Sequence, residues 1–310
     1  MKYTSRTKAE AIVWQKELRE ELGQLLKMED LLSRGTEMPL NPKTISSEDK
    51  SKYVMHEMEI NSTPTRRIEI VLTLPKDAQG PFPGIVAVAG HGGDRHTCYV
   101  KASYKQCAHV LAERGYVTIS TRVSQHDVYE NGRTLVGERL WDLMRCADYL
   151  ASLDDVDAKR IGCLGNSLGG EMVMWLAAMD ERMTASVSSG FLTRMDQMEK
   201  DHCMCWKFPG LRELVDFSDI YSLIAPRPLL CQNGLKEPPS QFPVPLAREA
   251  MKDIRPIYRD FGQPDNVALV AHEGGHEIHL PSLLAFFEKH LCGAKSEAPQ
   301  APAELPTNND

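Results

Sequence analysis

Short apolar runs alternate along the chain with longer stretches in which apolar residues recur at helical spacing. The run Gly84–Ala89 is apolar at nearly every position, as expected of a strand that is buried on both faces. Further short runs lie at 116–120, 160–164, 185–187, 228–232 and 267–271. Helical stretches lie between them, at 104–114, 138–152, 169–179, 246–261 and 281–291. This alternation predicts an α/β fold, a mostly parallel sheet with helices on both faces.

The first 80 residues follow a different pattern. Residues 7–32 carry Trp14, Leu18 and Leu22 at helical spacing, which predicts one N-terminal helical arm, and two prolines, Pro39 and Pro42, mark the linker after it. The alternating segments 53–60 and 66–74 predict an antiparallel hairpin. We therefore expect an arm and linker over 1–45, a main α/β domain over 46–295 and a disordered tail over 296–310.

Net charge, apolar runs and cysteine content exclude only a few classes of protein. A net charge of −7 and no basic run argue against nucleic acid or an anionic membrane as partner. The longest apolar run is too short to cross a bilayer, and no apolar segment follows the basic N-terminus as it would in a secretory signal. Eight cysteines without paired spacing are expected to be free thiols. These features together predict a cytoplasmic protein.

Ser167 is the candidate nucleophile. It stands in Gly165-Asn-Ser-Leu-Gly169, which matches the G-x-S-x-G motif, with a predicted strand before it and a helix-forming run after it. The glycines permit the close backbone approach of a strained strand-to-helix turn. Such a turn exposes the serine hydroxyl and directs a helix N-terminus toward a developing oxyanion.

The candidate base lies after the last predicted strand, in His272-Glu-Gly-Gly-His-Glu-Ile-His279. Three histidines compete there, and His276 is favoured because two glycines before it suit a tight loop. The letters also satisfy the zinc motif H-E-x-x-H, which requires a helix. Two central glycines would each cost a helix about 1 kcal/mol, so a metal site is not expected here, and no cofactor is predicted.

The candidate acid and oxyanion donors follow other predicted strands. Glu237 is the only carboxylate in the loop 233–239 after the penultimate strand, where it would hold the imidazole of His276 in the productive tautomer. The main-chain N–H of Leu168, next to the nucleophile, is one expected oxyanion donor. The glycine-rich loop 89–94 is expected to supply the other, and His91 is the choice, with Gly92 behind it.

Four segments carry a resemblance to a known group of enzymes: Gly90-His-Gly-Gly93, Gly165-Asn-Ser-Leu-Gly-Gly170, Ile224-Ala-Pro-Arg-Pro-Leu-Leu230 and Glu273-Gly-Gly-His276. Over residues 60–292 the chain resembles the dienelactone-hydrolase and acetyl-xylan-esterase-like branch of the α/β-hydrolase superfamily. In that branch the acid loop commonly carries aspartate where this chain has Glu237. The segment 201–210, with Cys203 and Cys205, also resembles that branch, but we can assign those cysteines no role.

The sequence thus predicts a serine carboxylesterase of the α/β-hydrolase fold that works through an acyl-enzyme. The resemblance implies a small-molecule ester substrate with a small acyl group, such as an acetyl ester of a sugar or alcohol. A peptidase of the prolyl-oligopeptidase type is one alternative, although no propeller-forming repeats precede the domain. A catalytically silent binding protein on the same fold is the other. The natural ester and the oligomeric state stay open.

Overall fold

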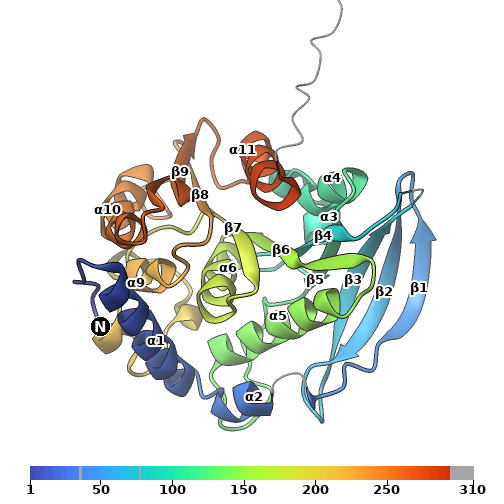
Figure 1. The fold of residues 1–310 in the computed structure, drawn as a ribbon, viewed down its shortest axis with the longest axis horizontal. Coiled ribbons are helices and arrows are strands. Elements are labelled where there is room, and N and C mark those ends of the chain that lie inside the picture. Colours follow the sequence, from blue (N-terminus) through green and yellow to red (C-terminus); the bar gives the residue numbers. More distant parts are fainter. Residues whose placement is uncertain (35–36, 77, 294–310) are drawn as a thin grey trace, which may run out of the picture.

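The core of the protein is one open sheet. The computed structural model describes residues 1–34, 37–76 and 78–293, and within these ranges nine strands pair in the order β1-β2-β3-β5-β4-β6-β7-β8-β9 (Figure 1). The first three strands and β5 pair antiparallel, whereas all later neighbours are parallel. The strands are β1 Lys43–Asp49, β2 Tyr53–Asn61, β3 Arg67–Pro75, β4 Phe82–Val88, β5 Val117–Thr121, β6 Val156–Asn166, β7 Met183–Ser189, β8 Leu229–Gly234 and β9 Val267–His272.

Helices cover both faces of this sheet, as the alternating pattern predicts. The α-helices of the described residues are α1 Lys8–Leu25, α2 Glu29–Arg34, α3 Thr97–Val100, α4 Cys107–Glu113, α5 Leu135–Ala151, α6 Leu168–Met179, α7 Met195–Met198, α8 Leu211–Leu214, α9 Phe217–Ser222, α10 Val244–Asp260 and α11 Leu280–Phe287. Short 3-10 turns lie at Ala102–Tyr104, Met204–Trp206 and Pro264–Asn266, and a π-helical turn at Glu288–Cys292 follows α11.

Two separate hydrophobic cores result, one on each face. Figure 1 shows α3, α4 and α11 on one side of the sheet and α1, α5 and α6 on the other. Strand β4 divides its side chains between them: Ile85 and Ala87 pack with α4 and α11, and Val86 and Val88 pack with α5 and α6. Since successive side chains of a strand point to opposite faces, a strand in this position must be apolar throughout.

The N-terminal arm differs from the single helix expected over 7–32. Helix α1 ends at Leu25 and α2 begins at Glu29, because Lys27 takes a left-handed conformation with φ of 58°. The N–H of Met28 bonds back to Gly23 O at 3.2 Å, which closes the helix end. That position usually holds glycine, so a lysine there gives no signal in the sequence.

The arm packs onto the main domain through buried polar contacts as well as apolar ones. The Gln15 amide donates to Ala225 O at 2.7 Å, and Arg19 donates to Ala178 O at 2.8 Å and to Leu223 O at 2.7 Å. Strand β1 begins inside the segment expected to be linker. All its residues are exposed, so it carries no alternation to detect.

The predicted hairpin is present as β2 and β3, paired in register from Tyr53–Pro75 to Asn61–Arg67. The tail predicted to be disordered, 296–310, lies outside the described residues. In the part of the chain that the structure describes, no helix has the length and apolar character needed to cross a membrane.

Candidate active site

Ser167 occupies a strained turn between β6 and α6. Its φ of 62° and ψ of −127° fall in a region that non-glycine residues rarely adopt. A Cβ at Gly165 would come within 2.3 Å of Gly169 O, and one at Gly169 within 2.2 Å of Val88 O. Both flanking glycines are thus required by close backbone packing, which is what the G-x-S-x-G pattern predicts.

Hydrogen bonds tie this turn to the neighbouring strand and to the histidine loop. Ser167 N–H donates to Ser189 O at 2.9 Å, at the end of β7. The Ser189 hydroxyl donates to the carbonyl of Glu277 at 3.2 Å, one residue after His276. A Cβ at Gly190 would lie 3.0 Å from His276 Cε1 and 2.9 Å from Asn166 Oδ1. The loop that carries His276 therefore lies against the nucleophile turn.

His276 and Glu237 form a direct pair. The Glu237 Oε1 atom lies 2.7 Å from His276 Nδ1, and the Glu237 side chain is fully buried whereas that of His276 is one-third exposed. Phe242 stacks on the imidazole with ring centroids 5.5 Å apart. Because Glu237 accepts at Nδ1, the Nε2 atom of His276 is left free to take a proton.

The loops that carry this pair are joined along their backbones. Leu235 N–H donates to His272 O at 2.7 Å and Lys236 N–H to Gly274 O at 3.0 Å. These bonds continue the pairing of β8 with β9 beyond the strand ends. The distance between the predicted acid and base is thus set by adjacent parallel strands.

The other two histidines of this loop are placed differently. His272 is buried at the end of β9, and burial together with neighbouring His279 lowers its pKa. Its Nδ1 accepts from Gly274 N–H at 3.2 Å, and its ring stacks on His279 with centroids 5.3 Å apart. His279 Nδ1 lies 2.8 Å from the Ser282 hydroxyl. Residues 273–279 form no helix, so the helical geometry of an H-E-x-x-H zinc site is absent from this segment.

Three aspartates near the ends of other elements have partners other than His276. Asp216 caps α9 and accepts from Phe217 N–H at 2.7 Å and Met195 N–H at 3.0 Å. Asp219 completes the capping box by accepting from Asp216 N–H at 2.9 Å. Asp253 pairs with Arg194 at 2.6 Å. Of the acids considered, Glu237 is the one that contacts the imidazole of His276.

The glycine-rich loop after β4 borders Ser167. Gly90 N–H donates to the Tyr104 hydroxyl at 2.7 Å, and a Cβ at Gly90 would lie 2.9 Å from Ser167 Cβ. Within the described residues, no hydrogen bond uses the main-chain N–H of His91 or of Leu168. The His91 side chain has another contact, because its Nε2 lies 3.2 Å from Cys205 Sγ.

That contact belongs to a cluster which the sequence analysis missed. His91, His126, Cys203 and Cys205 come together from three segments, with His126 Nε2 3.3 Å from Cys203 Sγ. Burial, with Arg139 nearby, lowers the pKa of His91 to about 4, and burial raises the pKa of Cys205 to about 12. The C-x-C spacing at 203–205 was the available signal, but its histidine partners lie far away in sequence.

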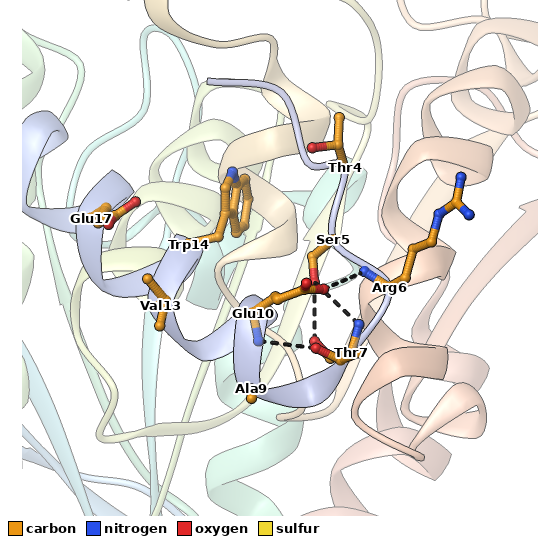
Figure 2. Close-up of a pocket in the computed structure, with 9 residues that line it drawn as sticks. All are labelled: Thr4, Ser5, Arg6, Thr7, Ala9, Glu10, Val13, Trp14 and Glu17. Carbon is orange, nitrogen blue, oxygen red and sulfur yellow. Dashed lines mark hydrogen bonds between the residues drawn. The ribbon is translucent and has the colours of Figure 1, made fainter.

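A surface hollow lies on the N-terminal segment, away from these residues in sequence. Figure 2 shows it lined by residues between Thr4 and Glu17, with the Glu10 carboxylate accepting from Ser5 and Arg6 and the Thr7 side chain capping α1. These bonds join neighbouring residues and organise a helix start. The hollow contains none of the candidate site residues.

Comparison with known proteins finds relatives among hydrolases. The family model described as the prolyl oligopeptidase family matches residues 102–221, less than half of the chain, which include Ser167 but neither Glu237 nor His276. YtaP of Bacillus subtilis strain 168, named as a hydrolase, is 24% identical over 264 residues, 77% of this chain and 87% of YtaP. Rat acyl-coenzyme A thioesterase 1 is 30% identical over 121 residues, 39% of this chain and 26% of that enzyme.

Solved structures extend the likeness to nearly the whole chain. Methylesterase BT1017 superposes with a TM-score of 0.75 at 21% identity, covering 92% of this chain and 65% of that one. The chain has the α/β-hydrolase fold. A glucuronoyl esterase from Solibacter usitatus has a TM-score of 0.65 at 19% identity, covering 81% of this chain and 86% of its own. An acetyl xylan esterase from Paenibacillus sp. R4 has a TM-score of 0.61 at 16% identity, covering 86% and 94%.

The predicted fold class, an α/β-hydrolase fold, is therefore confirmed, and so is the resemblance to α/β-hydrolases. In this structure the Ser167 turn lies between β6 and α6, and the loops with Glu237 and His276 follow β8 and β9. The chain order Ser167, Glu237, His276 is the order in which that fold presents its three catalytic groups.

Proposed function

We propose that the protein is a serine carboxylesterase in which Ser167 is the nucleophile, His276 the general base and Glu237 the acid that orients it. The observation that carries the proposal is the 2.7 Å contact between Glu237 Oε1 and His276 Nδ1, beside the strained Ser167 turn. Strained backbone conformations cluster at catalytic positions, and a base held by a third group is the general arrangement of an activated nucleophile.

The reaction would proceed in two acyl transfers. His276 Nε2 takes the proton of Ser167 Oγ as that oxygen attacks the ester carbonyl. The oxyanion is held by the main-chain N–H groups of His91 and Leu168, neither of which has another acceptor among the described residues. The tetrahedral intermediate collapses, His276 protonates the leaving alcohol, and an acyl group remains on Ser167. Water, deprotonated by His276, then attacks the acyl-enzyme and releases the acid.

The substrate we propose is a small acyl ester of a hydroxylated alcohol, such as an acetylated sugar. A hollow borders the oxyanion loop at Gly92, and its lining includes the polar side chains of Arg122, His126 and Tyr129. Such a lining suits a hydroxylated alcohol rather than a long acyl chain. An acetyl xylan esterase and a methylesterase among the structural neighbours support the ester class.

The test is covalent labelling with a fluorophosphonate, followed by hydrolysis of p-nitrophenyl esters of increasing chain length. We expect labelling of the wild type and of Ser33→Ala, a control serine on the surface of α2, and none of Ser167→Ala. Acetate should be turned over fastest among the esters. Absence of labelling in well-folded wild type would favour the silent binding protein instead.

A parallel panel separates this activity from the alternatives that the comparisons raise. Acetylated xylan, an acyl-coenzyme A and a dipeptidyl p-nitroanilide represent the esterase, thioesterase and peptidase classes. If the protein is labelled by the fluorophosphonate but cleaves only the dipeptidyl p-nitroanilide, it is a peptidase of the prolyl-oligopeptidase type and the esterase proposal is wrong.

A further inference from the structure

Four side chains with metal-binding atoms gather next to the oxyanion loop. His91 lies in the loop after β4, His126 in the loop after β5, and Cys203 and Cys205 in the segment between α7 and α8. Their imidazole nitrogens and thiol sulfurs all lie within 4.8 Å of one another. None of the bond-making steps proposed for ester hydrolysis uses these four side chains, although His126 also lines the hollow beside the oxyanion loop.

We propose that His91, His126, Cys203 and Cys205 bind a zinc ion. Zinc in proteins is held in tetrahedral sites by cysteine sulfur at about 2.3 Å and histidine nitrogen at about 2.0 Å, so the ligand atoms lie roughly 3.3–3.8 Å apart. Here Nε2 of His91 is 3.2 Å from Cys205 Sγ, and Nε2 of His126 is 3.3 Å from Cys203 Sγ. The four atoms therefore need only small adjustments to surround one ion.

The ligand set favours zinc over other common ions. Two thiolates and two imidazoles match the Cys₂His₂ class of zinc sites, whereas magnesium and calcium require oxygen ligands. Three of the four residues are exposed, so a hydrated ion can reach them from solvent. Four protein ligands complete the tetrahedron and leave no position for substrate, which is typical of a structural site.

Arg139 supplies a second layer around the cluster. The side chain is buried, and its Nη1 donates to Cys205 Sγ at 3.5 Å. An N–H donor directed at a sulfur favours the thiolate, the form that binds metal, so Arg139 opposes the rise that burial causes in the pKa of Cys205. Glu171 is also buried, and burial raises its pKa to about 7 although the charge of Arg139 opposes that rise. Two thiolates would by themselves neutralise the charge of Zn²⁺.

The zinc ion would join three loops at the edge of the active site. Its ligand His91 carries the main-chain N–H that we propose as an oxyanion donor, so binding would hold that donor against the segment with Cys203 and Cys205. This consequence rests on the proposed esterase function. The binding of zinc does not, because it requires only the four side chains.

Metal content of the full-length protein tests the site directly. Protein produced with added zinc under reducing conditions is analysed for zinc by mass spectrometry after gel filtration. We expect one zinc per chain in the wild type and in Cys292→Ser, an exposed cysteine outside the cluster, and loss of zinc in His126→Ala and in Cys203→Ser. Loss of a group that only hydrogen-bonds to a metal ligand lowers metal affinity about 10–100-fold. The zinc affinity of those two variants should fall by more than this, because each loses a ligand.

Cobalt substitution supplies a second measurement. Co²⁺ in the wild type should show thiolate charge-transfer bands and the visible bands of a tetrahedral ion, and both should be lost in Cys203→Ser. The proposal would be overturned if the wild type bound neither zinc nor cobalt when the metal is supplied in excess. It would also be overturned if all variants bound the same amount of metal, or if Cys203 and Cys205 formed a disulfide in reduced protein. Ser167→Ala should keep its zinc while losing fluorophosphonate labelling, so failure of the esterase proposal is distinguishable from failure of this one.

Discussion

The Glu237–His276 pair and the His–Cys cluster lie at the same edge of the sheet but are built in different ways. Glu237 and His276 come from short loops directly after β8 and β9, and the hydrogen-bonded register of those strands sets their spacing. His91 also follows its strand directly, after β4, but His126 and the two cysteines lie in longer segments after β5 and after β7, and the four meet only through packing across the sheet edge. Groups on strand ends can be anticipated from chain order, whereas groups on separate long loops cannot.

Of the changes that compare the two regions, substitution of the proposed nucleophile Ser167 should lower kcat the most. Ser167→Ala should lower kcat for p-nitrophenyl acetate by about 10⁴–10⁶, because triad groups act as a unit. The circular dichroism spectrum should not change. If homogeneous Ser167→Ala protein keeps more than a few per cent of the wild-type kcat, Ser167 is not the nucleophile.

The acid is next in expected effect. Glu237→Gln should lower kcat by about 10²–10⁴, since the amide no longer selects the productive tautomer of His276. Glu237→Asp restores the charge with a shorter reach and should recover part of the loss. Wild-type rates for Glu237→Gln from pH 6 to 9 would mean that the observed pair is only structural.

Metal removal should have a smaller effect than either change, because the cluster positions a loop and does not touch the reacting atoms. Chelation of zinc by EDTA under reducing conditions should lower kcat by up to about 10²-fold, the range expected from a small misplacement of a catalytic group. Fluorophosphonate labelling of Ser167 should persist, and added zinc should restore kcat. His126→Ala should match the chelated wild type and should not respond to zinc.

The smallest change in activity is expected at the aspartate that caps α9. Asp216→Ala should destabilise the protein by about 0.5–2 kcal/mol, measured from urea unfolding, because a helix cap is lost. Its kcat should equal that of the wild type. An inactive Asp216→Ala with normal stability would contradict the choice of Glu237 as the acid.

Much of the fold could be predicted from the sequence because the signals are local. The central strand β4 is a continuous apolar run, and long helices such as α5 and α10 carry their apolar residues at regular spacing. The break between α1 and α2 and the strand β1 were missed for equally local reasons. Lys27 holds a left-handed conformation that sequence does not mark, and β1 is exposed at every residue.

For the site, the sequence alone determined the Ser167 turn and the loops in which an acid and a base should be found. A motif that requires two glycines at close backbone contacts is specific, and chain order in a parallel sheet places the later loops at the same edge. Only the tertiary structure decided that, of the three histidines at and after the end of β9, His276 meets Glu237 while His272 and His279 stack on each other. It alone also joined His91 and His126 to Cys203 and Cys205, because contacts between separate loops depend on packing across the whole sheet edge, for which no local pattern exists.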